Sequence, residues 1–242
     1  MKTYSDIFKP GGLYALCGTL QEAFLEGLRR ETGWFCPPQT DWLPEKDLEA
    51  DIRLFGALFD DFSEKTCRDL LAQADIGSVS GEASRRLALL ALCMAREGVS
   101  LCFPDLIDLL PLPARNKAVS VLFEDPFRDG RAVVLAAGDV SALESVCDEV
   151  AVVRGEKHLL SFAPEDAGSS FTRATVKGDP ALPDAACILG KKRLGALTEV
   201  MLALSAEDAR AFLADCAAPA FTLSPMTPAD VVAALTQGGA DR

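Results

Sequence analysis

The sequence predicts a three-layer α/β domain with a mainly parallel sheet, a helical insertion and a small C-terminal α+β region. The main observation is an alternation of apolar strand-like runs and helical segments between Val99 and Arg154. An amphipathic helical segment runs from Leu43 to Ala74, and Pro, Gly and Ser become frequent from about Ala163. The resulting prediction is a main domain at residues 1–162, with a helical subdomain at about 43–97, and a C-terminal region at 163–242.

The composition fits a folded protein that does not bind nucleic acid through phosphates. Of the 242 residues, 49% are hydrophobic, which is enough for a substantial core. The 36 acidic and 24 basic residues give a formal charge of −12, which repels a polyanion. No signal-peptide core and no apolar stretch of ~20 residues is present, so we expect a cytoplasmic protein that reaches a membrane only through a partner.

The eight cysteines do not predict a metal site. They are scattered, no CxxC pair occurs, and the chain has a single histidine, so zinc and iron–sulfur spacings are missing. Several lie in apolar runs, as Cys93 and Cys102 do. We therefore expect buried, reduced thiols.

The N-terminal part predicts one strand and four helices. Leu13 to Gly18 forms a short apolar strand, and a helix follows from about Leu20 to Arg30. A lone glycine at this position is typical of a strand-to-helix turn. An acidic helix pair is expected from Leu43 to Ala74, and the next helix is apolar on all sides from Leu87 to Ala95, which predicts deep burial.

Three strands are expected in the second half of the main domain: Val99 to Phe103, Arg131 to Ala137 and Glu149 to Arg154. Between them we expect helices from Ala114 to Glu124 and from Ser141 to Cys147. Three carboxylates lie near strand ends without a nearby cation or metal-ligand spacing, and we expect them to be solvated loop residues: Asp105, Asp108 and Asp139.

The C-terminal region begins with a predicted linker from Ala163 to Ser170. Phe171 to Lys177 suits a strand, Arg193 to Leu204 suits strands or a strand and a helix, and Ala206 to Asp215 suits a short helix. A turn with two prolines precedes a last helix that ends near Thr236.

This order of elements, from Lys9 to Thr236, resembles the ATP-binding subunit of an ABC transporter. Three segments match the sequence pattern of that family: Ser80-Gly81, Arg85 to Ala88 and Leu143 to Val153. The Pro-containing turn and acidic residue before the last helix resemble the drug-exporter-like subfamily. The resemblance implies a P-loop NTPase-like sheet and a helical subdomain that grips a membrane subunit.

The residues that carry catalysis in that family are replaced here. The phosphate-binding loop would follow Gly18, but no second Gly and no Lys occurs there, and Glu22 adds a negative charge. Phe103-Pro104 stands where the family has its Walker B Asp and catalytic Glu, and Ala137 to Asp139 stands at the switch histidine. The resemblance therefore implies a degenerate ATPase without catalytic or metal-binding residues, which binds ATP only weakly or shares it with a partner.

The resemblance also implies what could remain functional. Ser80 and Gly81 match the signature residues that contact the nucleotide of a facing subunit, and Gln39 lands at the position that couples the ATP site to the permease. The implied partners are an active ATPase subunit or a second copy, and a membrane permease on whose inner face the chain would lie. The residues leave open that Ser80 only caps the next helix and that Gln39 is a loop residue after two prolines.

Two other functions are compatible with the sequence. The chain could be a soluble regulator or adaptor that uses the ATPase fold as a binding surface. A weak ATP-binding protein or ATPase is a third hypothesis, but phosphoryl transfer needs fixed cations or metal against a polyanion, and the family's cations and metal ligands are missing.

Overall fold

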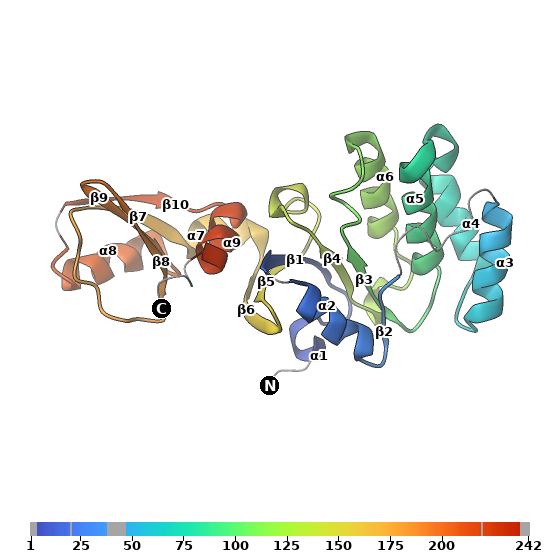
Figure 1. The fold of residues 1–242 in the computed structure, drawn as a ribbon, viewed down its shortest axis with the longest axis horizontal. Coiled ribbons are helices and arrows are strands. Elements are labelled where there is room, and N and C mark those ends of the chain that lie inside the picture. The colour runs from blue at the N-terminus through green and yellow to red at the C-terminus, as the bar shows by residue number, and fades with distance from the viewer. Residues whose placement is uncertain (1–3, 20, 38–46, 219, 238–242) are drawn as a thin grey trace. The chain divides into compact units, whose positions relative to one another are not determined.

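The computed structural model describes residues 4–19, 21–37, 47–218 and 220–237 (Figure 1). Two compact units divide the chain: Met1–Ala15 with Glu22–Gly138, and Leu16–Gln21 with Asp139–Arg242. The larger sheet has the strand order β2-β3-β4-β1-β5-β6, and a separate sheet has the order β10-β7-β9-β8. The domain limits predicted at residues 162 and 163 stay a prediction.

The strands of the first unit are short; β4 is buried, β3 is buried at its centre and β2 is half-buried. β2 (Trp34–Phe35), β3 (Ser100–Pro104) and β4 (Val133–Ala136) pair in parallel. The N–H of Val133 donates to Gly12 O at 3.0 Å, beside the start of β1 (Leu13–Thr19). The parallel α/β sheet predicted from the sequence is confirmed.

The longer helices of the first unit are amphipathic or buried. Leu87 to Ala95 is buried throughout, as its apolar sequence predicts. Two helices have side-chain caps, since Asp47 accepts from the N–H groups of Glu49 and Ala50, and Ser63 accepts from Thr66 N–H. The α-helices are α1 (Tyr4–Ile7), α2 (Gln21–Arg30), α3 (Leu48–Leu58), α4 (Glu64–Gln73), α5 (Gly81–Met94) and α6 (Leu112–Phe123).

The second unit contains a hairpin and a small antiparallel sheet. β5 (Glu149–Arg154) pairs with β6 (Lys157–Phe162) in an antiparallel hairpin. α8 (Ala206–Asp215) packs on the sheet through Ala209 and Leu213. The other elements are α7 (Ala167–Ser170), β7 (Thr172–Lys177), β8 (Ile188–Leu194), β9 (Leu197–Leu202), β10 (Phe221–Pro225) and α9 (Pro228–Gln237).

Two predictions of secondary structure are wrong. The helix expected from Ser141 to Cys147 is a 3-10 turn, Val140–Ala142, followed by a second turn in which Leu143 O accepts from the N–H groups of Val146 and Cys147. Asp139 accepts from Ser141 N–H and so fixes the first turn in its 3-10 form. The linker expected from Ala163 to Ser170 is instead a 3-10 turn followed by α7.

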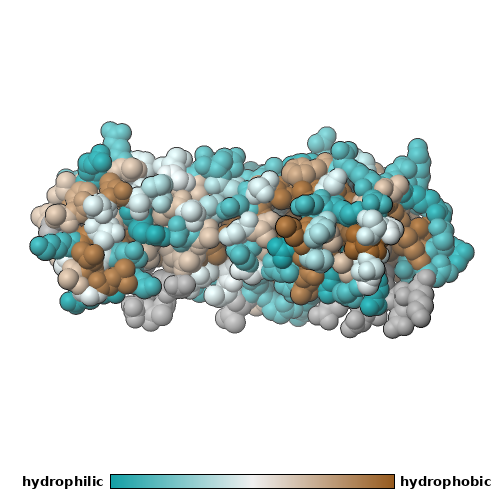
Figure 2. All heavy atoms as spheres, turned by 90° about the horizontal axis from the view of Figure 1, so that it is seen from above, coloured by the Kyte–Doolittle hydropathy of each residue, from teal (hydrophilic) through white to brown (hydrophobic). Residues whose placement is uncertain are grey.

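The surface shown in Figure 2 mixes hydrophilic and hydrophobic side chains. No helix in the described ranges is long and apolar enough to cross a membrane. The large hydrophobic side chains that are exposed are Leu54, Leu58, Leu109, Leu112, Phe123, Leu194 and Leu197.

Candidate functional site

The connection after β1 is the segment at which the sequence resemblance placed a phosphate-binding loop. β1 ends at Thr19 and α2 begins at Gln21, so a single residue separates strand and helix. Gly18 has a φ of 143°, and a Cβ added there would lie 1.9 Å from the carbonyl oxygen of Val153. Gly18 is thus needed because the backbone of β5 lies against it. From Gly11 to Leu28 the sequence has no Lys or Arg.

Hydrogen bonds from a side chain of α6 to backbone carbonyl groups hold the loop after β3. Phe103, which the resemblance aligned with the Walker B Asp, is 2% exposed, and Asp105 turns the chain with a φ of 53°. The guanidinium of Arg115, on α6, donates to Leu110 O at 2.7 Å and to Asp108 O at 3.2 Å. These bonds fix the loop from Asp105 to Leu110, which leads into α6.

The three carboxylates expected to be solvated lie in loops, Asp105 and Asp139 exposed and Asp108 half-buried, and two of them also have structural partners. Asp108 Oδ2 accepts a 2.6 Å hydrogen bond from the N–H of Gly138, and this bond ties the loop after β3 to the loop after β4. Asp139 accepts from Ser141 N–H at 2.9 Å and caps the 3-10 turn. Asp105 is exposed, as expected. The Asp108 contact joins positions 30 residues apart, so no local sequence pattern could indicate it.

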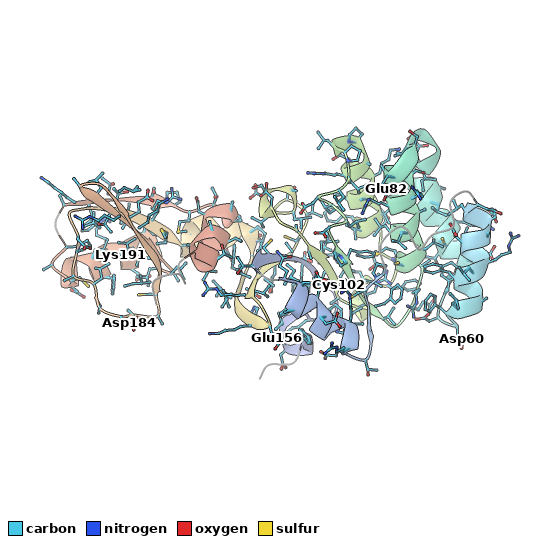
Figure 3. All side chains as sticks on the ribbon, viewed as in Figure 1. Asp60, Glu82, Cys102, Glu156, Asp184 and Lys191 are labelled. Atoms are coloured by element: carbon cyan, nitrogen blue, oxygen red, sulfur yellow. The ribbon has the colours of Figure 1, made fainter. Side chains whose placement is uncertain are left out.

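Ser80 and Gly81 lie where α5 begins. Ser80 occupies the N-cap position with extended backbone, is exposed, and makes no capping bond through its side chain. Gly81 has a φ of 68°, and a Cβ there would meet no atom within 4 Å, so the backbone conformation rather than space favours glycine. The carboxylate of Glu82, labelled in Figure 3, pairs with Arg85 and Arg86, each at 3.1 Å. The hydroxyl and the free N–H groups at the start of a helix favour the binding of an anion. Glu82 repels an anion less than an unpaired carboxylate would, because Arg85 and Arg86 offset its charge.

A lysine from α6 holds the turn that precedes Ser80. Lys117 Nζ donates to Asp75 O at 3.0 Å, to Asp75 Oδ2 at 2.9 Å and to Ser78 Oγ at 2.5 Å. The bond from Lys117, with a further bond from Ser78, lowers the pKa of the Asp75 carboxyl. Asp75 itself has a φ of 45°, so this contact supports a backbone conformation that is otherwise unfavourable. Sequence analysis missed Lys117 because its partners lie about 40 residues earlier in the chain.

Gln39, the predicted coupling residue, lies outside the described residues. Within the described ranges, no group of three or more His, Cys, Asp or Glu is arranged to hold a metal ion. His158, on β6, has Nε2 2.8 Å from Ser161 Oγ, within its own strand.

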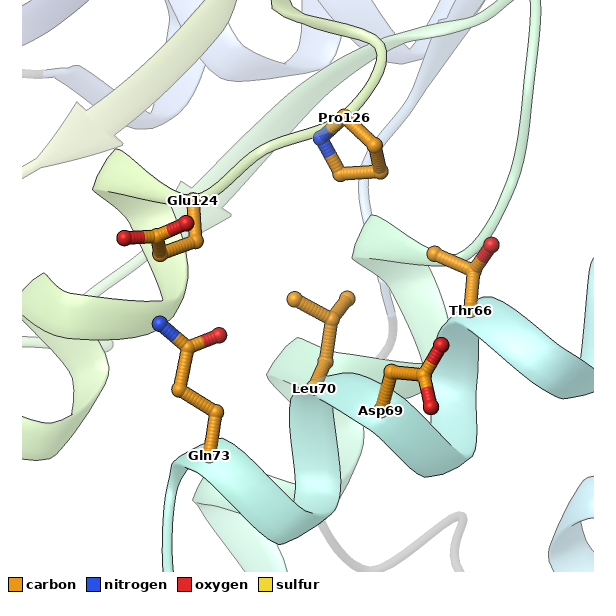
Figure 4. A pocket seen from close by; sticks show the side chains of 6 residues that line it. All are labelled: Thr66, Asp69, Leu70, Gln73, Glu124 and Pro126. Atoms are coloured by element: carbon orange, nitrogen blue, oxygen red, sulfur yellow. The ribbon is translucent and has the colours of Figure 1, made fainter.

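Sequence analysis did not indicate a hollow of about 240 Å³ beside α4 (Figure 4). Glu124 and Pro126 follow α6 and precede β4, so they belong to the amino end of that strand. Ligands of open α/β sheets bind at the carboxyl ends of strands, which argues against this hollow as a nucleotide site. Its lining is Thr66, Asp69, Leu70, Gln73, Glu124 and Pro126.

Comparison with solved structures shows the fold of ABC-transporter ATP-binding subunits. One structure, titled as the ATP binding subunit of an ABC transporter, has a TM-score of 0.52 and 13% sequence identity, over 66% of this chain and 82% of that one. A putative ABC transporter ATP-binding protein from Pyrococcus furiosus has a TM-score of 0.43 and 12% identity, over 55% and 80% of the two chains. No family model and no curated protein matches the sequence.

Proposed function

We propose that this chain is a non-catalytic subunit of the ABC-transporter type, related to the drug-exporter-like subfamily, which pairs with an active ATPase subunit, a membrane permease or both. The observation that carries the proposal is the fold of an ATP-binding subunit combined with a β1–α2 connection of one residue that carries no cation. Phe103-Pro104 at the end of β3 adds no metal ligand and no base.

In this proposal the retained chemistry is the start of α5. Ser80 and Gly81 would contact a nucleotide held by the facing subunit, and Lys117 would position them through the turn at Asp75 to Ser78. Gln39 would lie at the contact with the permease. The chain's own site would hold no ATP, or hold it weakly, and the protein would act at the inner face of the membrane as a peripheral subunit.

The first test is a calorimetric titration of the purified chain with Mg·ATP, at protein concentrations that reveal a Kd of ~1 mM, or ~−4 kcal/mol. We expect no heat of binding, because phosphates would find no lysine or arginine after β1. Binding tighter than ~10 µM would contradict the empty-site proposal and call for a hydrolysis assay.

The second test addresses the shared site and uses the chain reconstituted with the ATPase subunit and permease that copurify with it. Ser80→Ala should reduce ATP turnover about tenfold or more, since a charge-assisted bond to phosphate contributes about 1.5–3 kcal/mol. Ser224→Ala, at an exposed serine of β10, is the matched control and should leave turnover unchanged. Equal turnover of both variants would reject the shared site, and a chain that never copurifies with a permease would favour the soluble adaptor.

A further inference from the structure

Two cysteines from distant parts of the sequence meet in the first unit. β2 and β3 pair in parallel with Phe35 opposite Leu101, so the next residues in register are Cys36 and Cys102. Adjacent strands lie about 4.8 Å apart, which falls within the Cα separation of about 4.4–6.8 Å that a disulfide needs. The two side chains share a hydrogen bond, and both thiols are free.

The two thiols have different environments. Cys102, labelled in Figure 3, lies in β3 and is fully buried, whereas Cys36 follows the edge strand β2 and is half-buried. The hydrogen bond from Cys102 lowers the pKa of Cys36, and the nearby Arg29 guanidinium lowers it further against the opposing effect of burial. The same hydrogen bond, with burial, raises the pKa of Cys102. Because Cys36 is the more accessible of the two sulfurs and its pKa is the lowered one, an oxidant would reach Cys36 before Cys102.

Two other buried cysteines, Cys67 and Cys93, have a different environment. Burial raises the pKa of Cys67 to about 12 and raises that of Cys93 further, so both stay protonated thiols. Cys187 and Cys216 have an intermediate exposure like that of Cys36. Exposure alone therefore does not distinguish Cys36, but the neighbouring thiol and guanidinium do.

We propose that Cys36 and Cys102 form a peroxide-reactive thiol pair, in which Cys36 is oxidised first and Cys102 then closes a disulfide. The Cys36 thiolate attacks a hydroperoxide such as H₂O₂; an S–O bond forms, the O–O bond breaks, and the released hydroxide takes up a proton as water. The sulfur of Cys102 then attacks the sulfenic acid; the S–S bond forms, the S–O bond breaks, and a second water leaves with the Cys102 proton. Both sulfurs are oxidised and the peroxide is reduced.

The reaction would change a weak part of the sheet. β2 contributes only two residue pairs to its contact with β3, Trp34 with Ser100 and Phe35 with Leu101. A covalent bond one residue further along would fix this edge strand to the buried strand. The inference stands on the thiol pair alone and does not depend on the proposed transport function.

The test uses the full-length reduced chain, treated with one equivalent of H₂O₂ and analysed by intact mass and peptide mapping. The wild type should lose two hydrogens and give a linked peptide that contains Cys36 and Cys102. Cys36 should react about five- to tenfold faster than Cys187, because the neighbouring Cys102 thiol and the Arg29 guanidinium favour the thiolate of Cys36. Equal rates at the two sites, or no link between Cys36 and Cys102, would overturn the proposal.

Variants separate the two steps. Cys102→Ala keeps the buried site apolar and should leave a sulfenic acid at Cys36 that a 1,3-dione traps. Cys36→Ser should give neither the trapped product nor the disulfide, whereas the matched variant Cys187→Ser should behave as the wild type. Trapping at Cys36 in the wild type to the same extent as in Cys102→Ala would show that Cys102 does not resolve the intermediate, and would overturn the pair.

Discussion

The two ends of β3 and β4 are stabilised in different ways. At the amino end, three buried charged residues meet: Arg96 precedes β3, and Asp125 and Arg131 precede β4. At the carboxyl end, where open α/β sheets bind ligands, half-buried or exposed side chains bond to the backbone, those of Asp108, Arg115 and Asp139. The buried charges thus stabilise the amino ends of these two strands, away from the edge at which open α/β sheets bind ligands.

Arg131 is the centre of the amino-end network. Its guanidinium donates to both carboxylate oxygens of Asp125, at 2.8 and 2.5 Å, and to the carbonyl oxygens of Met94 and Arg96. The Arg131 and Asp125 side chains are each only 1% exposed. Arg96 in turn pairs with Asp61 at 3.0 Å and lies 3.9 Å above the ring of Phe59. The network joins the end of α5 to the starts of β3 and β4.

The largest effect is expected from Arg131→Met. The substitution leaves the Asp125 carboxylate buried without its cation and frees two carbonyl oxygens, so we expect a loss of about 3–5 kcal/mol in the free energy of unfolding. Urea unfolding followed by circular dichroism measures it.

Two further variants test whether the loss in Arg131→Met comes from the buried ion pair. Arg30→Met removes an exposed arginine that pairs with Glu26, and should change the free energy of unfolding by less than about 1 kcal/mol. The double variant Arg131→Met/Asp125→Asn should cost less than Arg131→Met and Asp125→Asn added together, because no unpaired charge stays buried. Losses that simply add would show that the pair is not the source of the stability.

A smaller effect is expected at the carboxyl end of β1. Gly18→Ala places a Cβ against the Val153 carbonyl at a positive φ, so β5 must move, and we expect a loss of about 1–3 kcal/mol. Gly155→Ala, in the turn after β5, has a φ of 57° and open space around the added Cβ. That control should lose only about 1 kcal/mol. Equal losses in urea unfolding would mean that β5 relaxes and that Gly18 is not required by packing.

Apolar patterns predicted most helices and strands but not the side-chain contacts between them. The buried run from Leu87 to Ala95 and the strand from Glu149 to Arg154 can be predicted because their own residues determine burial and period. The Asp108–Gly138 and Lys117–Asp75 contacts could not be predicted, because they depend on how separate elements dock. The Cys36–Cys102 pair likewise depends on the register of β2 and β3.

The candidate site was predictable mainly through the family resemblance. The sequence pattern predicted that Ser80 and Gly81 lie at the start of a helix, and in the structure α5 begins at Gly81. Whether the Ser80 hydroxyl caps that helix could not be decided, because serine suits both a cap and a ligand contact. The sequence predicted that Gly18 lies in a strand-to-helix turn. Its close approach to the Val153 carbonyl could not be predicted, because it depends on how β1 packs against β5.

The smallest expected change in the free energy of unfolding comes from a comparison of two serines that precede helices, Ser63 before α4 and Ser80 before α5. Ser63, whose N–H donates to Ala95 O near the amino-end network, caps α4 by accepting from Thr66 N–H at 3.3 Å. Ser63→Ala should therefore cost about 1 kcal/mol. Ser80→Ala removes a hydroxyl that makes no capping bond, and should change the free energy of unfolding by less than about 0.5 kcal/mol. Urea unfolding of both variants decides the matter: equal losses would show that Ser80 caps α5 in solution, and any loss of turnover in Ser80→Ala would then reflect helix stability and not a contact with nucleotide.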